Sequence, residues 1–310
     1  MGRTFRFGVV TSNAADGATW RERARNAEAL GYSTLLMPDH FQEQWAPLVG
    51  LTIAVEATEK LRVGAMVFDN DYRHPVVLAK EIATLDLATE GRVEFGLGAG
   101  WLRTDYESSG MPYDRPGVRI DRMAEGLAVM KALWRSAEPV KFDGEHYRID
   151  GTIGTPRPHT SPHPPVCIGG GGRRVLSIAA READIVAINA TLTTGEVGAE
   201  AAATATPAAF DEKIRWVREA AGDRFADIEL QCHCPVTMVV PNREEVAKAM
   251  APAFGLDPDE ALDIPLALVG TTDQLCETLL ERRDRYGFTY WIVPDTAMEA
   301  FGPVVARLAG

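Results

Sequence analysis

The chain has 310 residues, of which 46% are hydrophobic and 25% charged, and it carries a net charge of −12. This composition is typical of a globular protein with a sizeable core, and the acidic balance without a basic run argues against nucleic-acid binding. No apolar run approaches the roughly 20 residues that cross a bilayer, and the N-terminus lacks a signal-peptide core, so we expect a cytoplasmic protein without a membrane partner. The four scattered cysteines predict no disulfide framework.

Short apolar strands alternate with amphipathic helices over the first hundred residues. Strands are predicted at residues 5–10, 34–37, 61–68 and 92–98. Parallel neighbours need a helical crossover, so this alternation predicts a parallel sheet. Ligands of such sheets bind at the carboxyl ends of the strands. The loops that hold His40, Asn70 and Gly98 should therefore converge on one face.

The alternation is interrupted after residue 100 and then resumes. A polar loop over 101–118, a helix over 120–133, an Asp-Gly hairpin over 142–149 and a proline-rich connector over 155–165 are expected in that order. Further strands are predicted at 166–168, 185–188, 228–240 (broken by Pro235) and 290–293. The Ala-, Thr- and Gly-rich stretch 189–207 is predicted to be mobile.

The strand count, about eight, favours one (β/α)8 TIM barrel over two doubly wound domains. We expect a single domain over residues 1–310, with insertions near 101–165 and 189–207.

The glycines at 96, 98 and 100 stand at the end of a predicted strand. Neither a Rossmann fingerprint nor a P-loop fits them, because the glycine spacing fails and no Gly-Lys-Ser/Thr sequence occurs. Two interpretations remain: tight packing against a helix, or close approach of a ligand to Gly98, Ala99 and Gly100.

A second glycine run, Gly169, Gly170, Gly171 and Gly172, precedes Arg173 and a helix pattern. Its backbone N–H groups and the helix N-terminus predict an anion site, with arginine adding charge. The alternative, a flexible turn, is less favoured because four glycines lose much conformational entropy on folding.

His40 ends a predicted strand beside Asp39. It is equally consistent with an acid, base or hydrogen-bond donor and with a structural histidine held by Asp39. The sequence Cys232-His233-Cys234 suggests a metal site, but strand alternation separates the histidine from the sulfurs and no second ligand cluster accompanies them. Core packing is favoured there, and we expect no metal. Serine-hydrolase and zinc-protease motifs are absent.

Several segments in a fixed order resemble the bacterial luciferase-like superfamily, and most closely its actinobacterial branch dependent on coenzyme F-420. They are EALGYSTLLMPDHF at 28–41, RHP at 73–75, LDLATEGR at 85–92, GLGAGW at 96–101, PVCIGGGG at 165–172, AAREAD at 179–184 and VGTTD at 269–273. The resemblance implies a (β/α)8 barrel with an insertion, a homodimer, and reduced flavin or deazaflavin as cofactor.

Residue roles follow from the resemblance position by position. His40 matches a histidine at the reacting face of the deazaflavin ring, and Asp39 matches a cofactor contact. The bond between Met66 and Val67 matches a cis peptide that backs the ring. We also place Asn70, Gly98, Ala99 and Gly100 among the cofactor contacts, with residues 169–173 binding its phosphate.

Two tryptophans are predicted on the substrate side. Trp45 resembles its counterpart in the sugar-phosphate dehydrogenase subgroup. Trp101 stands where that subgroup has a catalytic glutamate. Sugar-phosphate chemistry is therefore not carried over, and Trp101 is assigned to stacking or to lid packing.

The resulting hypothesis is a coenzyme F-420-dependent oxidoreductase that transfers a hydride between the deazaflavin and a small organic substrate. One alternative is a monooxygenase that uses oxygen and reduced FMN, with the reduced FMN supplied by a separate reductase. Another is a flavin-binding barrel without turnover.

Overall fold

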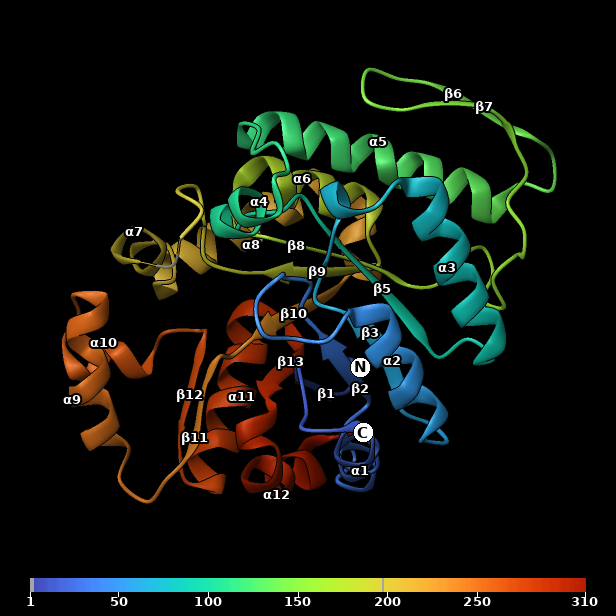
Figure 1. Ribbon diagram of the computed structural model, residues 1–310. Coiled ribbons are helices and arrows are strands. Elements are labelled where there is room, and N and C mark those ends of the chain that lie inside the picture. Colours follow the sequence, from blue (N-terminus) through green and yellow to red (C-terminus); the bar gives the residue numbers. More distant parts are fainter. Residues whose placement is uncertain (1–2, 197) are drawn as a thin grey trace.

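Strands from the whole length of the chain close into one parallel barrel (Figure 1). In the computed structural model, which describes residues 3–196 and 198–310, nine strands form the main sheet, and β4 continues β3 to leave eight positions. The ring closes because β1 pairs with both β2 and β13, and β3 pairs with β5. The barrel strands are β1 (Arg6–Val10), β2 (Thr34–Met37), β3 (Arg62–Ala65), β4 (Phe68–Asp69), β5 (Val93–Gly98), β8 (Val166–Gly170), β9 (Ile185–Ile188), β10 (Glu229–His233) and β13 (Phe288–Pro294). The predicted (β/α)8 barrel is confirmed.

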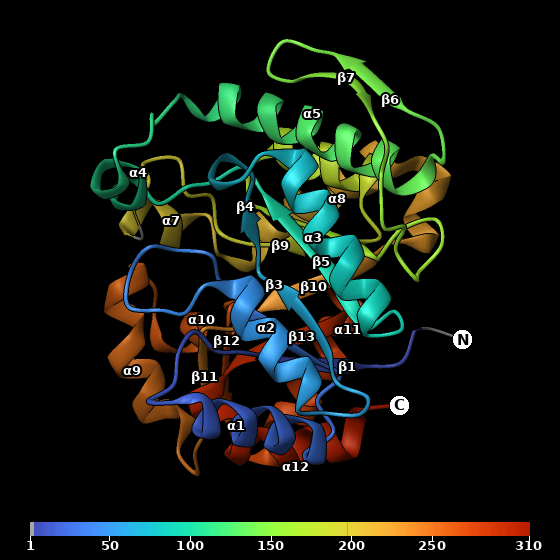
Figure 2. The ribbon, with the colours of Figure 1, turned by 45° about the vertical axis from the view of Figure 1, so that its right-hand side comes forward.

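Helices surround this barrel, as the two ribbon views show (Figures 1 and 2). Proline opens α3, as its position after His74 predicted, and a capping box at Thr271 opens α11. The surrounding helices are α1 (Gly17–Ala29), α2 (Pro47–Glu56), α3 (Pro75–Ala88), α5 (Pro116–Arg135), α6 (Arg173–Glu182), α8 (Pro207–Ala221), α11 (Thr272–Tyr286) and α12 (Met298–Leu308).

Strand alternation divides the apolar core into two clusters. Residues such as Phe7, Leu35 and Phe95 point outward and pack against the helices in the larger cluster. The smaller cluster fills the inside of the barrel with Leu36, Cys167, Ile185, Ala187, Tyr290 and Ile292. Because both faces of the strands are covered, these strands read as nearly continuous apolar runs in the sequence.

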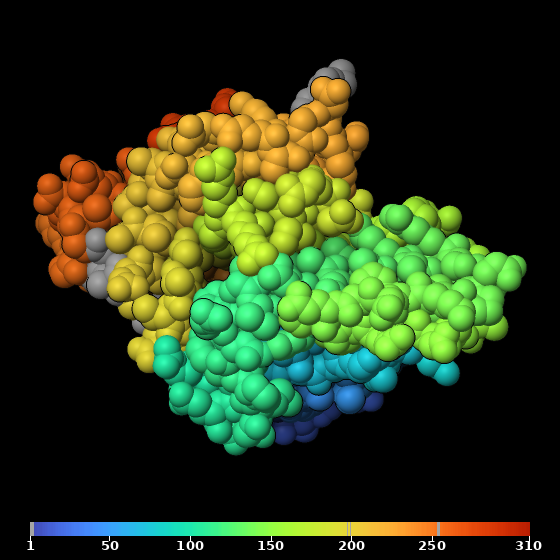
Figure 3. Space-filling view, turned by 90° about the horizontal axis from the view of Figure 1, so that it is seen from above, coloured from blue at the N-terminus to red at the C-terminus, as the bar shows by residue number. Residues whose placement is uncertain are grey.

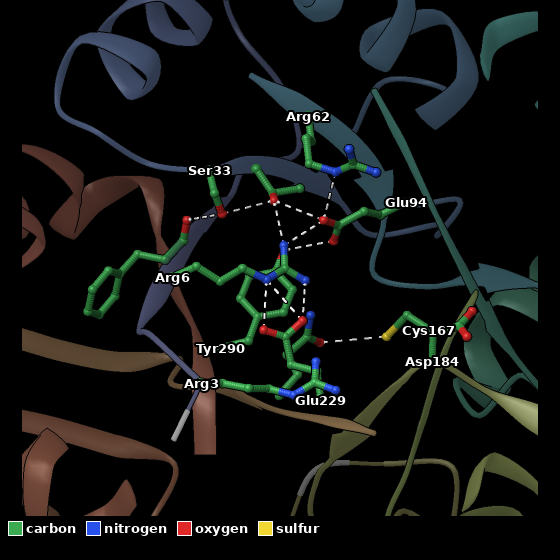
Figure 4. Close-up of polar contacts among 12 residues, drawn as sticks. Arg3, Arg6, Ser33, Arg62, Glu94, Cys167, Asp184, Glu229 and Tyr290 are labelled. Atoms are coloured by element: carbon green, nitrogen blue, oxygen red, sulfur yellow. Dashed lines mark hydrogen bonds and ion pairs between the residues drawn. The ribbon is translucent and has the colours of Figure 1, made fainter. Parts of the chain in front are cut away.

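Charged side chains meet inside the barrel at the amino ends of its strands (Figure 4). Arg6 bonds Glu94 at 2.5 Å and Glu229 at 2.6 Å, and Arg62 Nε donates to Glu94 at 3.0 Å. The Tyr290 hydroxyl donates to Glu94 at 3.1 Å, and its ring lies 3.5 Å from the Arg6 guanidinium carbon. We call these five residues the floor network.

The predicted Asp-Gly hairpin is confirmed as β6 (Val140–Asp143) paired antiparallel with β7 (Arg148–Thr152), and it projects beyond α5 (Figure 2). The prediction of an irregular loop over 101–118 is wrong, because α4 (Arg103–Ser109) lies there. Helix α7 (Ala199–Ala203) lies in the segment expected to be mobile.

The long strand region predicted at 228–240 divides after His233. Its second half, β11 (Val236–Val239), leaves the barrel and pairs in parallel with β12 (Ala267–Gly270). Helices α9 (Arg243–Phe254) and α10 (Pro258–Leu262) connect these two strands. The sequence did not predict this excursion. Short 3-10 helices, η1 (Asn70–Tyr72), η2 (Gly222–Asp227) and η3 (Asp295–Ala297), complete the described elements. No helix in the described ranges is long and apolar enough to cross a membrane.

Candidate active site

The loops after β2 and β5 bring a histidine and an aspartate together at the carboxyl ends of the barrel strands. His40 Nδ1 lies 2.6 Å from Asp105 Oδ2, and the Asp105 side chain is only 2% exposed. The same carboxylate accepts bonds from the Tyr72 hydroxyl at 3.2 Å and from the Phe41 backbone N–H at 3.3 Å. With the carboxylate accepting, neutral His40 carries its proton on Nδ1 and leaves Nε2 as an acceptor.

Within the described residues, no protein group bonds His40 Nε2, and the His40 side chain is 22% exposed. The histidine is therefore fixed through one nitrogen and available through the other, an arrangement suited to proton transfer. Sequence reasoning found His40 but missed Asp105. An acid in the first turn of a helix after β5 was the available signal, and it was lost because this helix was interpreted as a loop.

Trp101 forms a wall beside His40. The two rings meet edge to face, with centroids 5.6 Å apart and planes at 88°. The Trp101 carbonyl accepts a bond from the Tyr113 hydroxyl at 3.0 Å, which fixes the backbone of this loop. Trp101 has no carboxylate to replace the glutamate of the sugar-phosphate dehydrogenase subgroup. The buried acid that follows β5 is instead Asp105, four residues later in α4.

Asp39 ties together the loops that follow β2 and β4. It forms an ion pair with Arg73 and accepts the Asp69 backbone N–H at 3.1 Å. Its side chain is buried. The observed role of Asp39 is thus to fix the loop that carries His40, and its contact with a cofactor stays a prediction.

A second buried carboxyl group, Asp69, anchors α4 from the other side. The Tyr106 hydroxyl donates to Asp69 Oδ2 at 3.0 Å and lies 3.1 Å from Asp71 Oδ2. Burial raises the pKa of Asp69 to about 7, and the nearby charges of Asp71 and Asp39 add to the shift. Two consecutive residues of α4, Asp105 and Tyr106, therefore hold this helix over the site.

The glycines of β5 make room for protein atoms. The peptide bond between Met66 and Val67 is cis, as predicted, and a Cβ on Gly98 would stand 2.5 Å from Val67 Cγ2. Gly100 has φ +70°, and a Cβ there would overlap the Tyr106 hydroxyl and Asp69. The Ala99 carbonyl accepts Arg119 Nε at 3.2 Å. Close packing explains Gly98 and Gly100, and their contact with a cofactor remains a prediction.

Asn70 and Trp45 both have protein partners. Asn70 is buried, and its amide donates to the Tyr147 hydroxyl at 3.0 Å. Trp45 packs on Trp20 with ring centroids 5.1 Å apart. The predicted roles of Asn70 toward a cofactor and of Trp45 toward a substrate are untested by these contacts.

The second glycine run leads into α6, as predicted. Gly170 and Gly171 pack against Val175 and the Ala190 carbonyl, where a side chain would not fit. Gly172 differs, because a Cβ there would meet nothing within 4 Å, and it is the N-cap of α6 without a side-chain cap. Arg173 is 69% exposed and lies 3.8 Å from Glu219. The first-turn N–H groups of this helix fit a phosphate group, and no described side chain caps them.

The Cys232-His233-Cys234 sequence divides between the two sides of β10. Both sulfurs lie 3.4 Å from the Pro265 carbonyl, in the outer core. His233 is the last residue of β10, and burial lowers its pKa to about 4. Sequence reasoning placed His233 apart from the sulfurs but did not assign it to the site. In the described part of the chain, no group of three His, Cys, Asp or Glu side chains could hold a metal ion.

The segment after β9 and the loop after β5 meet at this end of the barrel (Figure 3). Arg103 donates its backbone N–H to the Gly195 carbonyl at 3.3 Å and its side chain to the Thr194 carbonyl at 3.0 Å. Both predicted insertions thus contribute to the rim around His40.

Comparison with known families matches residues 4–254 to the model described as luciferase-like monooxygenase. The chain belongs to this family. The F-420-dependent glucose-6-phosphate dehydrogenase of Intrasporangium calvum is 31% identical over 169 residues, which cover 51% of this chain and 49% of that protein. The FMNH(2)-dependent dimethylsulfone monooxygenase of Pseudomonas putida is 28% identical over 188 residues, 57% of this chain and 51% of that protein.

A solved F-420-dependent secondary alcohol dehydrogenase has the same fold, with a TM-score of 0.81 at 18% identity over 99% of this chain and 100% of that one. The matches cover about half of these two curated relatives. Luciferase-like relatives thus include enzymes that use F-420 and enzymes that use FMN, and both kinds act on small molecules.

Proposed function

We propose that this protein is a coenzyme F-420-dependent oxidoreductase in which His40 handles a proton beside the reacting centre. The observation that carries the proposal is the His40–Asp105 pair, at 2.6 Å, with the second nitrogen of His40 unengaged by any described residue. The family membership and the relatives that use F-420 support it.

The residues present fit a phosphate-bearing tricyclic cofactor. The uncapped N-terminus of α6 at Gly172 suits the phosphate, and Arg173 adds positive charge nearby. The Met66–Val67 peptide lies between β3 and β4, and Gly98 at the end of β5 pairs with Asp69 of β4. When bound, the deazaflavin supplies the hydride chemistry.

The protein's own part is to orient and to manage the proton. Asp105 holds the His40 ring and stabilises its charged form, so that Nε2 takes a proton from the substrate hydroxyl in one direction and returns it in the other. Trp101 shields one edge of the ring from water. The hydrogen bonds between Asp105 and His40 and between Tyr106 and Asp69 fix α4 and keep this arrangement rigid.

The second candidate is a monooxygenase using reduced FMN, delivered by a separate reductase. The dimethylsulfone monooxygenase relative favours it. Both cofactors carry a phosphate and a tricyclic ring, so the same α6 site suits either. A homodimer remains our expectation for either function.

Equilibrium titration of the purified protein with oxidised F-420 and with FMN, followed by fluorescence quenching, tests the proposal. We expect tighter binding of F-420. A matched variant, Gly172→Glu, places a carboxylate at the α6 N-cap and should weaken both cofactors, whereas Ala226→Glu, at an exposed position of η2, should not. Tighter binding of FMN would replace the proposal by the monooxygenase. Binding of F-420 without its reduction or oxidation by any member of an alcohol and carbonyl panel would favour a binding protein.

A further inference from the structure

His233 faces the inside of the barrel at the same end as His40. Its neighbours Cys232 and Cys234 belong to the outer cluster, and strand alternation turns the residue between them inward. Its partner in register on β13 is Ile292, a member of the inner cluster. As the last residue of β10, His233 lies where the strand opens into the mouth.

The His233 ring has no assigned role within the protein. Among residues 3–196 and 198–310, no side chain or backbone group hydrogen-bonds it, and burial alone lowers its pKa to about 4. At neutral pH it is therefore an uncharged imidazole with one donor and one acceptor nitrogen. Such a group in a ligand-binding mouth is suited to a polar atom of a bound molecule.

Four cations in the loops and helices around the mouth are already bonded to protein groups. Arg73 pairs with Asp39, and Arg122 pairs with Asp71 and Asp114. Arg119 donates to the Ala99 and Gly100 carbonyls. Lys213, almost fully buried, donates to the Asn189 and Thr204 carbonyls at 2.7 Å each.

One buried carboxylate adds negative potential beside His40. Asp39 and Asp71 pair with arginines, but Asp105 has no lysine or arginine partner among the described residues. Taking an anion out of water costs much free energy unless a cation compensates it. A substrate that carried its own phosphate or carboxylate would meet a neutral histidine and the Asp105 carboxylate there.

We propose that His233 is a substrate-binding residue that hydrogen-bonds an uncharged hydroxyl or carbonyl oxygen, so that the protein selects neutral alcohols or carbonyl compounds over phosphorylated and carboxylated ones. This inference rests on the proposed oxidoreductase function, because it assigns the substrate class of that same site.

Two pairs of probes that differ in charge test the substrate class: cyclohexanol with 4-hydroxycyclohexanecarboxylate, and glucose with glucose 6-phosphate. Each probe is added to protein with bound F-420 and isotope-labelled histidine rings. The NMR signal of His233 is identified as the one that is missing from the spectrum of His233→Gln. We expect it to shift with a neutral probe and not with the charged partner. A shift with either anion, or none with both neutral probes, overturns the inference.

Variants separate recognition from cofactor binding. His233→Phe and His233→Gln should keep the F-420 dissociation constant of the native protein. His233→Phe should raise KM for a neutral substrate about tenfold, with a smaller change in kcat, and His233→Gln should recover part of the loss because its amide keeps a donor and an acceptor. His159→Phe, at an exposed position, is the matched control.

The two failures are distinguishable. Loss of F-420 affinity in both His233 variants would make His233 a cofactor contact and overturn the inference alone. Failure of the native protein to bind F-420 would instead remove the proposed function.

Discussion

The two ends of the barrel both hold buried charged groups, but they use them differently. At the amino end, the floor network arises from strand residues, and its charges satisfy one another: Arg6 bridges two glutamates, and Glu94 is also bonded by Arg62 and Tyr290 (Figure 4). At the carboxyl end, the polar groups stand at strand ends and on the segments that follow them, and His40 and His233 retain unused hydrogen-bonding capacity among the described residues.

This difference separates stability from chemistry. A network on regular strands whose charges all have partners has no group left to bind a ligand. Removing one of its members leaves a buried charge without its partner. Loops held by a few buried bonds can direct a free nitrogen at a ligand while the barrel supplies rigidity. Substitutions at the floor should therefore affect unfolding, and substitutions at the mouth should affect turnover.

The largest expected effect is on stability, at the floor. Burial opposes the charge of Glu94, but Arg6 and Arg62 outweigh it and lower its pKa. Replacing Glu94→Gln leaves those cations without their shared partner, and we expect a loss of about 3–5 kcal/mol in the free energy of unfolding. Because the folded pKa is depressed, this contribution is present above the ordinary glutamate pKa and is lost as pH falls through the folded value.

Urea unfolding of the Glu94 variant beside Asp150→Asn measures this effect. Asp150 pairs with Lys141 at 3.0 Å on the exposed hairpin, where a surface pair contributes about 0–1 kcal/mol. Equal midpoints for the two variants would show that the floor network does not stabilise the barrel.

The next largest effect is on turnover, at His40. His40→Ala should lower kcat about 10²–10⁴-fold if the imidazole transfers a proton, while the dissociation constant of the cofactor changes little. Steady-state kinetics and fluorescence titration measure the two quantities, with His159→Ala as control. A parallel loss of affinity and rate would mark His40 as a cofactor contact.

A smaller effect is expected at Asp105, which acts through His40. Asp105→Asn removes the charge that holds Nδ1 and should lower kcat about 10–100-fold. Glu107→Gln, at an exposed position on the same helix, should leave kcat unchanged. If both variants retain full activity, the positioning role assigned to Asp105 is wrong.

The smallest expected effect is a pH dependence of stability at Asp69. Its folded pKa of about 7 lies above the ordinary aspartate value, so ionisation is costlier in the folded state. Native stability should decline by about 1–3 kcal/mol as pH rises from about 4 to about 7, and Asp69→Asn should lose that decline. Thermal unfolding at a series of pH values measures it, and identical slopes for the two proteins would refute the assignment.

The sequence by itself determined the barrel, because the barrel strands and most helices have a local apolar period and parallel strands require helical crossovers. It also located His40 at a strand end and the helix N-terminus at Gly172, since each belongs to a short local motif, whereas the cis bond at Met66 was implied by the family resemblance. It misjudged α4, whose polar residues show no apolar period.

Only the tertiary structure decided which groups act together. Asp105 meets His40 across a sequence separation of 65 residues, and Glu94 meets Arg6 across 88. The spaces left by Gly98 and Gly100 are filled by Val67 and Tyr106, which local spacing does not reveal. Whether a polar side chain has all of its hydrogen bonds satisfied or keeps a group free for a ligand depends on its neighbours in space. Those neighbours are set by how the barrel closes.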